Sequence, residues 1–207
     1  MLNRNMPKKQ FSINFDYRCP FARNVNEHVI NALRHGADYE VSFKGFSLNR
    51  VHVEDGGLSV FDDPNEKENL LAVAAGIVVR DKLPDSFYDA HLELFAARHD
   101  HAQDLRSESV IRSALERAKI DSEYVFKELE EGWPYDEFRF EHESSVTEHQ
   151  VFGVPTFIVD DAAVFVRLMT RGTHVSGEDS VKTIDNVISL IVDHTEINEF
   201  KYTSISR

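Results

Sequence analysis

Cysteine is nearly absent from this sequence, since Cys19 is the only one among 207 residues. An intramolecular disulfide is therefore impossible, and the chain does not belong to the disulfide-stabilised secreted class. A zinc site built from four cysteines is excluded for the same reason. A lone cysteine is either a small buried hydrophobic residue or a nucleophile, and its neighbours in the sequence distinguish the two.

Long apolar runs are absent too. No stretch reaches the ~18 residues of a membrane span. The basic N-terminal residues 1–10 are not followed by an apolar stretch of signal-peptide length. The formal net charge is -13, and an acidic surface repels both phosphate backbones and anionic lipids. We therefore expect a cytoplasmic protein with neither a nucleic-acid nor a membrane partner.

Glycine-rich phosphate loops and metal-ligand spacings are also missing. Without such a loop we expect no nucleotide cofactor. The densest group of possible ligands is His99-Asp100-His101. Two histidines at i and i+2 do not share a helix face, and no third ligand follows nearby, so we expect no metal site.

Three other polar or aromatic residues have open interpretations. His28 lies more than two turns along a predicted helix from Cys19, so we expect it at the surface. His142 and His149 are seven residues apart, can share a helix face, and could approach the thiol. Trp133 is either a packed residue at a helix end or an aromatic wall over the thiol.

The apolar pattern predicts an α/β fold. Residues 11–15 alternate with period two as in a strand, residues 21–33 have helical spacing, and residues 41–46 resemble a second strand. After a loop at 47–62, helical patterns fill residues 63–150. Residues 156–168 then read as a hairpin, and residues 181–191 carry one apolar helical stripe. We therefore predict one domain from residues 1–62 and 151–207, with residues 63–150 inserted as an all-helical subdomain.

Cys19 follows the first predicted strand and precedes a helix that starts with Pro20. A helix N-terminus presents unpaired N–H donors and a partial positive charge, which favour the thiolate. Such surroundings lower a cysteine pKa to about 3.5–7.5. Arg18 and Arg23 flank the thiol and could add to this effect. The position predicts a nucleophile with a lowered pKa.

Two segments together resemble the DsbA-like thioredoxin superfamily: residues 15–22 (FDYRCPFA) and, after the helical block, residues 153–157 (GVPTF). The resemblance implies a thioredoxin-like fold in which the Cys-Pro motif faces a cis-proline loop. Residues 163–168 and 198–201 are most similar to the actinobacterial branch, near mycothiol-dependent nitroreductases. More distant relatives are 2-hydroxychromene-2-carboxylate isomerases and kappa-class glutathione transferases.

The resemblance implies roles for individual residues. Cys19 matches the attacking cysteine, Pro155 the cis-proline, and Val154 the residue whose backbone pairs with a bound peptide or thiol. Ala22 stands where dithiol members have their resolving cysteine, so a second thiol must come from outside. That thiol would be mycothiol or glutathione. The expected thiol- and substrate-binding residues are Arg18, Pro20, Phe21, Ala22, Val154, Pro155 and Thr156.

Three functions remain open at this point. The first is a one-cysteine, thiol-dependent oxidoreductase acting on a small molecule or a protein disulfide. The second is an isomerase or transferase that uses a bound small thiol, and the third is a redox-inactive binding protein on a thioredoxin fold. We expect no permanently bound cofactor beyond the small thiol, and the sequence allows a homodimer without requiring one.

Overall fold

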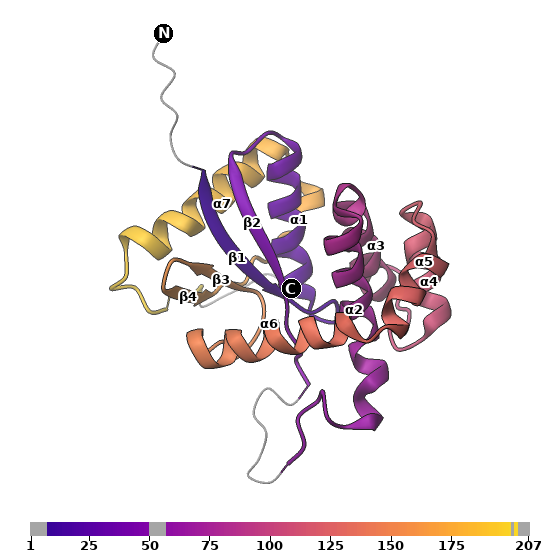
Figure 1. Ribbon diagram of the computed structural model, residues 1–207. Coiled ribbons are helices and arrows are strands. Elements are labelled where there is room, and N and C mark those ends of the chain that lie inside the picture. Colours follow the sequence, from indigo (N-terminus) through magenta and orange to yellow (C-terminus); the bar gives the residue numbers. More distant parts are fainter. Residues whose placement is uncertain (1–7, 50–56, 200, 203–207) are drawn as a thin grey trace.

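The computed structural model describes residues 8–49, 57–199 and 201–202. Within them a four-stranded sheet has the order β2-β1-β3-β4 (Figure 1). β1 and β2 are parallel, whereas β3 is antiparallel to both β1 and β4. The strands are β1 (Lys9–Phe15), β2 (Tyr39–Gly45), β3 (Thr156–Val159) and β4 (Ala162–Phe165). The predicted α/β fold, with a helical segment between its early and late strands, is confirmed.

Helices cover both faces of the sheet. α1 (Pro20–Arg34) connects β1 to β2, and α7 (Gly177–Asp193) packs against it. Inward residues of β1 such as Ile13 and Phe15 are fully buried on this side. The opposite face meets α6 (Trp133–His149), where the Asn14 side chain donates a hydrogen bond to Ser145 Oγ at 2.9 Å. The sheet therefore lies between two helical layers.

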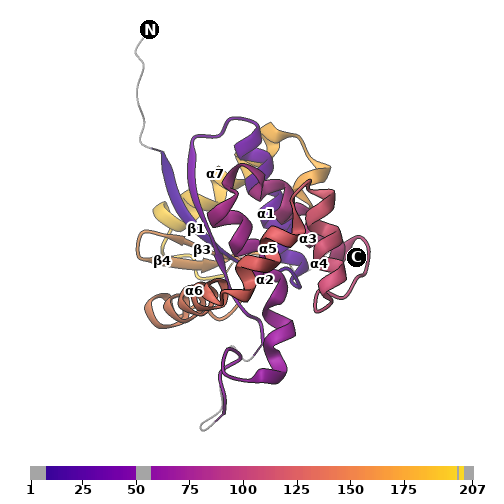
Figure 2. The ribbon, with the colours of Figure 1, turned by 45° about the vertical axis from the view of Figure 1, so that its right-hand side comes forward.

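The remaining helices form a block beside the β2 edge (Figures 1 and 2). α2 is buried on nearly all sides, as its apolar sequence predicts. Asp63 caps the short turn η1, since its carboxylate accepts the N–H of Asn65, and α2 begins at Lys67. The elements are η1 (Pro64–Glu66), α2 (Lys67–Lys82), η2 (Pro84–Ser86), α3 (Phe87–His99), α4 (Glu108–Arg117) and α5 (Ser122–Glu130).

An ion-pair network fastens the end of α3 to α1. Asp100 follows α3 and pairs with Arg23 of α1 at 3.1 Å and with Arg171 at 2.8 Å. Arg171 precedes the short turn η3 (Gly172–His174) and also pairs with the buried Glu27 at 2.6 Å. Arg23 is therefore committed to the fold and does not point its charge at the thiol.

One predicted strand is shorter than expected, and one predicted loop lies partly outside the described residues. The last apolar run extends to Leu168, but β4 ends at Phe165. In the expected loop, residues 47–49 and 57–62 form neither helix nor strand, and residues 50–56 lie outside the described residues. No helix within the described ranges has the length and apolarity needed to cross a membrane.

Candidate thiol site

Cys19 is the N-cap residue of α1. Its Sγ accepts the N–H of Ala22 at 3.4 Å and donates to the carbonyl oxygen of Val154 at 3.3 Å. Pro20 occupies the first turn of the helix, where its missing N–H costs nothing. The side chain is only 7% exposed. Two chain segments more than a hundred residues apart thus meet at one sulfur atom.

The environment shifts the Cys19 pKa in the direction opposite to the one predicted. Burial raises the pKa of the thiol, while the N–H groups of Ala22 and Phe21 oppose the rise. The nearby Asp16 carboxylate raises it further, and the positive charge of Arg167 lowers it. The prediction of a lowered pKa was wrong because desolvation of the thiolate outweighs the helix N-terminus.

The peptide bond between Val154 and Pro155 is cis. Both residues are buried, and the turn is closed by the Thr156 hydroxyl, which donates to the carbonyl oxygen of Gly153 at 2.8 Å. Thr156 itself pairs with Asn14 of β1, so this turn continues directly into the sheet. The loop holds the Val154 carbonyl against Cys19 and fixes one wall of the site.

Arg18 does not serve the thiol directly. Its guanidinium makes two hydrogen bonds to Asp16, at 3.0 and 2.6 Å, and one to Asn49 at 2.8 Å. The charge near the sulfur comes instead from Arg167, just beyond β4. Arg167 was not among the predicted site residues. It could have been found, because it is the one charged residue in the apolar run 163–168, which belongs to the hairpin after Pro155.

Aromatic side chains surround Arg167. The half-buried ring of Phe21 lies 5.2 Å from its guanidinium, and Phe165 lies 5.9 Å from it. Phe152, 61% exposed in the proline loop, packs on Phe165 at 5.4 Å. Ala22 is fully buried and supplies only its backbone N–H to the sulfur. The thiol therefore borders a partly exposed aromatic surface with one cation.

A series of buried hydrogen bonds joins the residues on either side of Cys19. The Tyr17 hydroxyl bonds to His91 Nδ1 at 2.8 Å, and His91 Nε2 bonds to Asn26 Oδ1 at 2.9 Å. Asn26 donates to the Ala22 carbonyl at 2.7 Å. Burial lowers the pKa of His91 to about 3, so the ring is neutral at physiological pH. With Asn26 Oδ1 as acceptor, Nε2 carries the proton and Nδ1 accepts from Tyr17.

His28 and His142 have structural partners away from the thiol. His28 was expected at the surface, but it is 3% exposed and bonds to Ser180 and Thr170. That expectation failed because α7 and the segment before η3 cover this side of α1. His142 is buried and accepts the N–H of Ser47 at 3.2 Å, so it supports the chain after β2. His149 lies half-buried at the last residue of α6.

Trp133 and the His99-Asp100-His101 cluster also lie outside the chemistry at the sulfur. Trp133 donates to Glu128 at 2.9 Å and packs under Lys82, at the far end of α2 from the thiol. His99 bonds to the Tyr17 carbonyl oxygen at 2.9 Å. The described ranges contain no group of three metal-ligating side chains. Because its contacts are with Glu128 and Lys82, Trp133 is a packed residue at a helix end and not a wall over the thiol.

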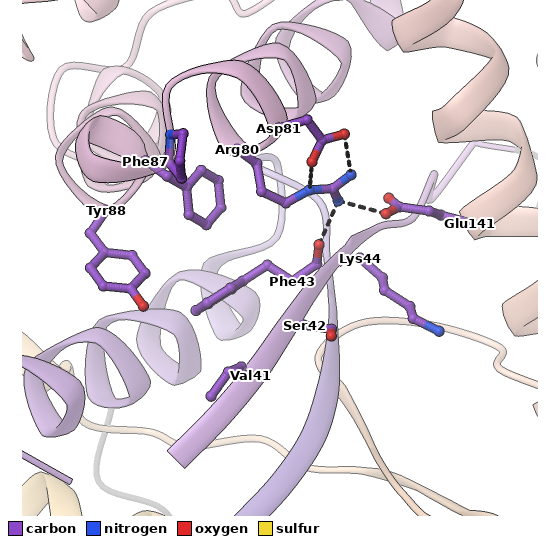
Figure 3. Close-up of a pocket in the computed structure, with 10 residues that line it drawn as sticks. Val41, Ser42, Phe43, Lys44, Arg80, Asp81, Phe87, Tyr88 and Glu141 are labelled. Atoms are coloured by element: carbon purple, nitrogen blue, oxygen red, sulfur yellow. Dashed lines mark hydrogen bonds and ion pairs between the residues drawn. The ribbon is translucent and has the colours of Figure 1, made fainter. Parts of the chain in front are cut away.

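Two cavities lie among the described residues, and the thiol is in the lining of neither. The thiol-side cavity, about 300 Å³, is walled by Asp16, Tyr17 and Arg18, by α2, and by the chain from Arg98 to Arg106. The edge cavity, about 410 Å³, lies along β2 (Figure 3). Figure 3 shows Arg80 between Asp81 and Glu141, with Phe87 and Tyr88 across the opening. The thiol-side cavity is named for Asp16, Tyr17 and Arg18, which precede Cys19 in the chain, but neither cavity has Cys19, Val154 or Arg167 in its lining.

Comparisons with known proteins agree with this fold. A DSBA-like thioredoxin domain matches residues 11–189. Reduced DsbA1 from Neisseria meningitidis is similar over 95% of this chain and 91% of its own, with 18% identity and a TM-score of 0.57. A probable DsbA oxidoreductase from Streptomyces coelicolor covers 93% of both chains, with 14% identity and a TM-score of 0.58.

A 2-hydroxychromene-2-carboxylate isomerase is similar too. The match covers 90% of this chain and 98% of that chain, with 14% identity and a TM-score of 0.60. No match was found among curated proteins. At these identities the structural likeness establishes the thioredoxin-like fold with its helical insertion, as predicted.

Proposed function

Because this chain belongs to the DsbA-like thioredoxin family, we propose that it is a thiol-dependent oxidoreductase with Cys19 as its single nucleophile. The observation that carries the proposal is the contact of Cys19 Sγ with the start of α1 on one side and the Val154 carbonyl on the other. The aromatic surface with Arg167 gives a small substrate a place to bind beside the sulfur.

The reaction runs through one mixed disulfide. The Cys19 thiol loses its proton to solvent, and the thiolate attacks one sulfur of a disulfide R–S–S–R′, which forms a Cys19–S–R bond, breaks the S–S bond and expels R′–S⁻. Ala22 offers no second thiol, so an external small thiol R″–S⁻ attacks the mixed disulfide, releases R–S–S–R″ and regenerates Cys19. The N–H groups of Phe21 and Ala22 and the charge of Arg167 stabilise the thiolate during both steps.

The external thiol is mycothiol or glutathione in this proposal. The similarity of the C-terminal segment to the actinobacterial branch favours mycothiol. We also propose a cytoplasmic location, because one unpaired thiol without a resolving cysteine depends on a reducing pool of small thiols.

A second function has support from one specific observation. Since burial raises the pKa of Cys19, a neutral thiol could serve as a hydrogen-bond donor beside a bound small thiol. An isomerase or transferase would work in this way, and an isomerase has the same fold. A redox-inactive binding protein would share the fold and leave Cys19 unreactive.

Mass spectrometry distinguishes these functions. The protein is incubated with mycothiol disulfide or glutathione disulfide, and the mass of Cys19-containing peptides is measured. The oxidoreductase proposal expects an adduct that forms on wild type, is absent from Cys19→Ser, and disappears when the reduced small thiol is added. If neither disulfide forms an adduct with Cys19, the oxidoreductase proposal is wrong. Isomerase activity retained in Cys19→Ser would establish the second function instead.

A further inference from the structure

The chain on both sides of Arg167 is fastened to the two segments that form the thiol site. The N–H of Val166 donates to the carbonyl oxygen of Pro155 at 3.0 Å, so the residue before Arg167 is joined to the proline loop. The carbonyl oxygen of Leu168 accepts from the side chain of Asn24 at 2.9 Å, so the residue after Arg167 is joined to α1. The backbone therefore holds Arg167 beside the thiol site, although it lies beyond the end of β4.

The Arg167 side chain is exposed and lies over two aromatic rings. Its guanidinium carbon is 5.2 Å from the ring centre of Phe21 and 5.9 Å from that of Phe165. Within the described ranges this guanidinium makes neither a hydrogen bond nor an ion pair. Its charge acts on the Cys19 sulfur, whose pKa it lowers. Arg167 is thus held by ring contacts alone, next to the thiol.

The two arginines that flank the thiol in the sequence have carboxylate partners. Arg18 pairs with Asp16 at 2.6 Å, and Arg23 pairs with Asp100 at 3.1 Å. Their charges and donors are therefore used within the protein, in a chain whose net charge is -13. Of these three arginines, Arg167 is the one that can still bind an anion from outside.

The ring contacts of Arg167 favour a carboxylate on a flat molecule. A guanidinium that lies over a ring keeps its N–H donors at the edge of its own plane, where two of them match the two oxygens of a carboxylate. Phe152 is 61% exposed and extends the same surface, because its ring lies 5.4 Å from that of Phe165. A planar substrate can therefore lie against these rings while its carboxylate reaches Arg167.

We propose that the disulfide substrate of Cys19 carries a carboxylate that binds to Arg167, with its apolar body on the rings around that guanidinium. In the proposed reaction the carboxylate belongs to group R, which stays bonded to Cys19 after R′–S⁻ has left and must therefore fit beside the sulfur. The inference rests on the proposed function and adds a chemical class to it, because it makes the substrate an acidic one. It places no requirement on the external small thiol.

Two nitroaryl disulfides of similar shape test the proposal. 5,5′-Dithiobis(2-nitrobenzoate) carries a carboxylate on each ring, whereas 2,2′-dithiobis(5-nitropyridine) is neutral. With either probe the Cys19 thiolate bonds to one aryl sulfur, the S–S bond breaks, and the other aryl thiolate is released and followed by its absorbance. The ratio of the two second-order rate constants is compared between variants. A change in the Cys19 pKa alters both rates together and leaves this ratio nearly unchanged.

We expect Arg167→Gln to lower the ratio of anionic to neutral rates about fivefold at low salt, and much less at about 1 M salt. Arg167→Lys keeps the charge without the planar pair of donors, and it should recover less than half of that loss. Arg34→Gln is the matched control, because it removes the same charge from an exposed site at the far end of α1.

Three results would overturn the carboxylate site alone, with Cys19 still reactive toward both probes. They are an unchanged ratio in Arg167→Gln, an equal fall in Arg167→Gln and Arg34→Gln, and full recovery in Arg167→Lys. If wild-type Cys19 reacts with neither probe, the proposed function fails as well.

Discussion

The edge cavity and the thiol-side cavity contain the same kinds of residue but use them differently. In the edge cavity, Arg80 donates to the Phe43 carbonyl at 2.7 Å and pairs with Asp81 and Glu141, so its donors belong to the fold. In the thiol-side cavity, Arg98 donates to none of the described residues. The presence of an arginine in a cavity is therefore a poor guide to a binding site. What matters is whether a charge has already been used to hold the chain together.

The largest loss of stability is expected from a substitution in the edge cavity. Glu141 accepts the Gly45 N–H at 2.7 Å and pairs with Arg80, and only 9% of its side chain is exposed. Glu141→Ala leaves both donors without this acceptor, and we expect it to lower the free energy of unfolding by about 3 kcal/mol. Urea unfolding followed by circular dichroism measures the change. The exposed Glu143→Ala should cost less than about 0.5 kcal/mol, and equal losses would contradict the comparison.

The next effect is a pH dependence of stability. Burial raises the pKa of Glu141 from 4.5 to about 7, against the opposing influence of Arg80 and the Gly45 N–H. The folded protein therefore binds this proton more tightly than the unfolded chain. The resulting stabilisation is fully present below pH 4.5 and is lost as the pH rises through about 7.

The variant Glu141→Gln isolates this contribution. Between pH 5 and pH 8, the stability of wild type relative to Glu141→Gln should fall by roughly 2 kcal/mol. The difference between the two proteins cancels the buried His91 and His142, whose lowered pKa values act in the opposite direction at acidic pH. Parallel pH profiles for the two proteins would show that Glu141 is ionised throughout.

A smaller loss of stability is expected from a substitution in the aromatic cluster around His91, which lies between the two cavities. His91 packs on Phe43 and Phe87 of the edge cavity and bonds to Tyr17 of the thiol-side cavity. Tyr17→Phe removes the donor from His91 Nδ1 and should cost about 1 kcal/mol. Tyr88→Phe is the control, because its hydroxyl makes no hydrogen bond within the described residues. A loss in Tyr88→Phe as large as that in Tyr17→Phe would mean that the buried bond is not the cause.

The smallest expected effect is on Arg98. Because the side chain is exposed and unpaired within the described ranges, Arg98→Gln should change the unfolding free energy by less than about 0.5 kcal/mol. The same unfolding measurement applies. A loss near 2 kcal/mol would place Arg98 with Arg80 among the residues that hold the fold, and the contrast between the cavities would disappear.

Local patterns in the sequence were sufficient for the fold. The period-two spacing of residues 11–15 and the apolar stripe of residues 181–191 predicted elements that the structure contains. Cys19 before Pro20 predicted the start of α1. These predictions succeeded because each depends on neighbours within a few residues. The boundaries of the inserted subdomain remain a prediction.

The pKa shift of Cys19 and the charges around it could not be predicted from local sequence patterns. Whether Cys19 is desolvated depends on Val154 and the rest of the proline loop, which lie more than a hundred residues away. Arg18 is adjacent in sequence, yet it turns toward Asp16 and Asn49. Arg167, distant in sequence, supplies the charge instead. Proximity along the chain says little about the direction in which a long side chain points.

The contacts of Arg80 and Glu141 have a consequence for association between molecules. β2 is one of the two edge strands of the sheet, and an edge normally offers free carbonyl and N–H groups to strands of other chains. Here Arg80 occupies the Phe43 carbonyl and Glu141 occupies the Gly45 N–H, in the place where a neighbouring strand would otherwise pair. The protein thus blocks edge-to-edge aggregation at this end of β2 with side chains of its own.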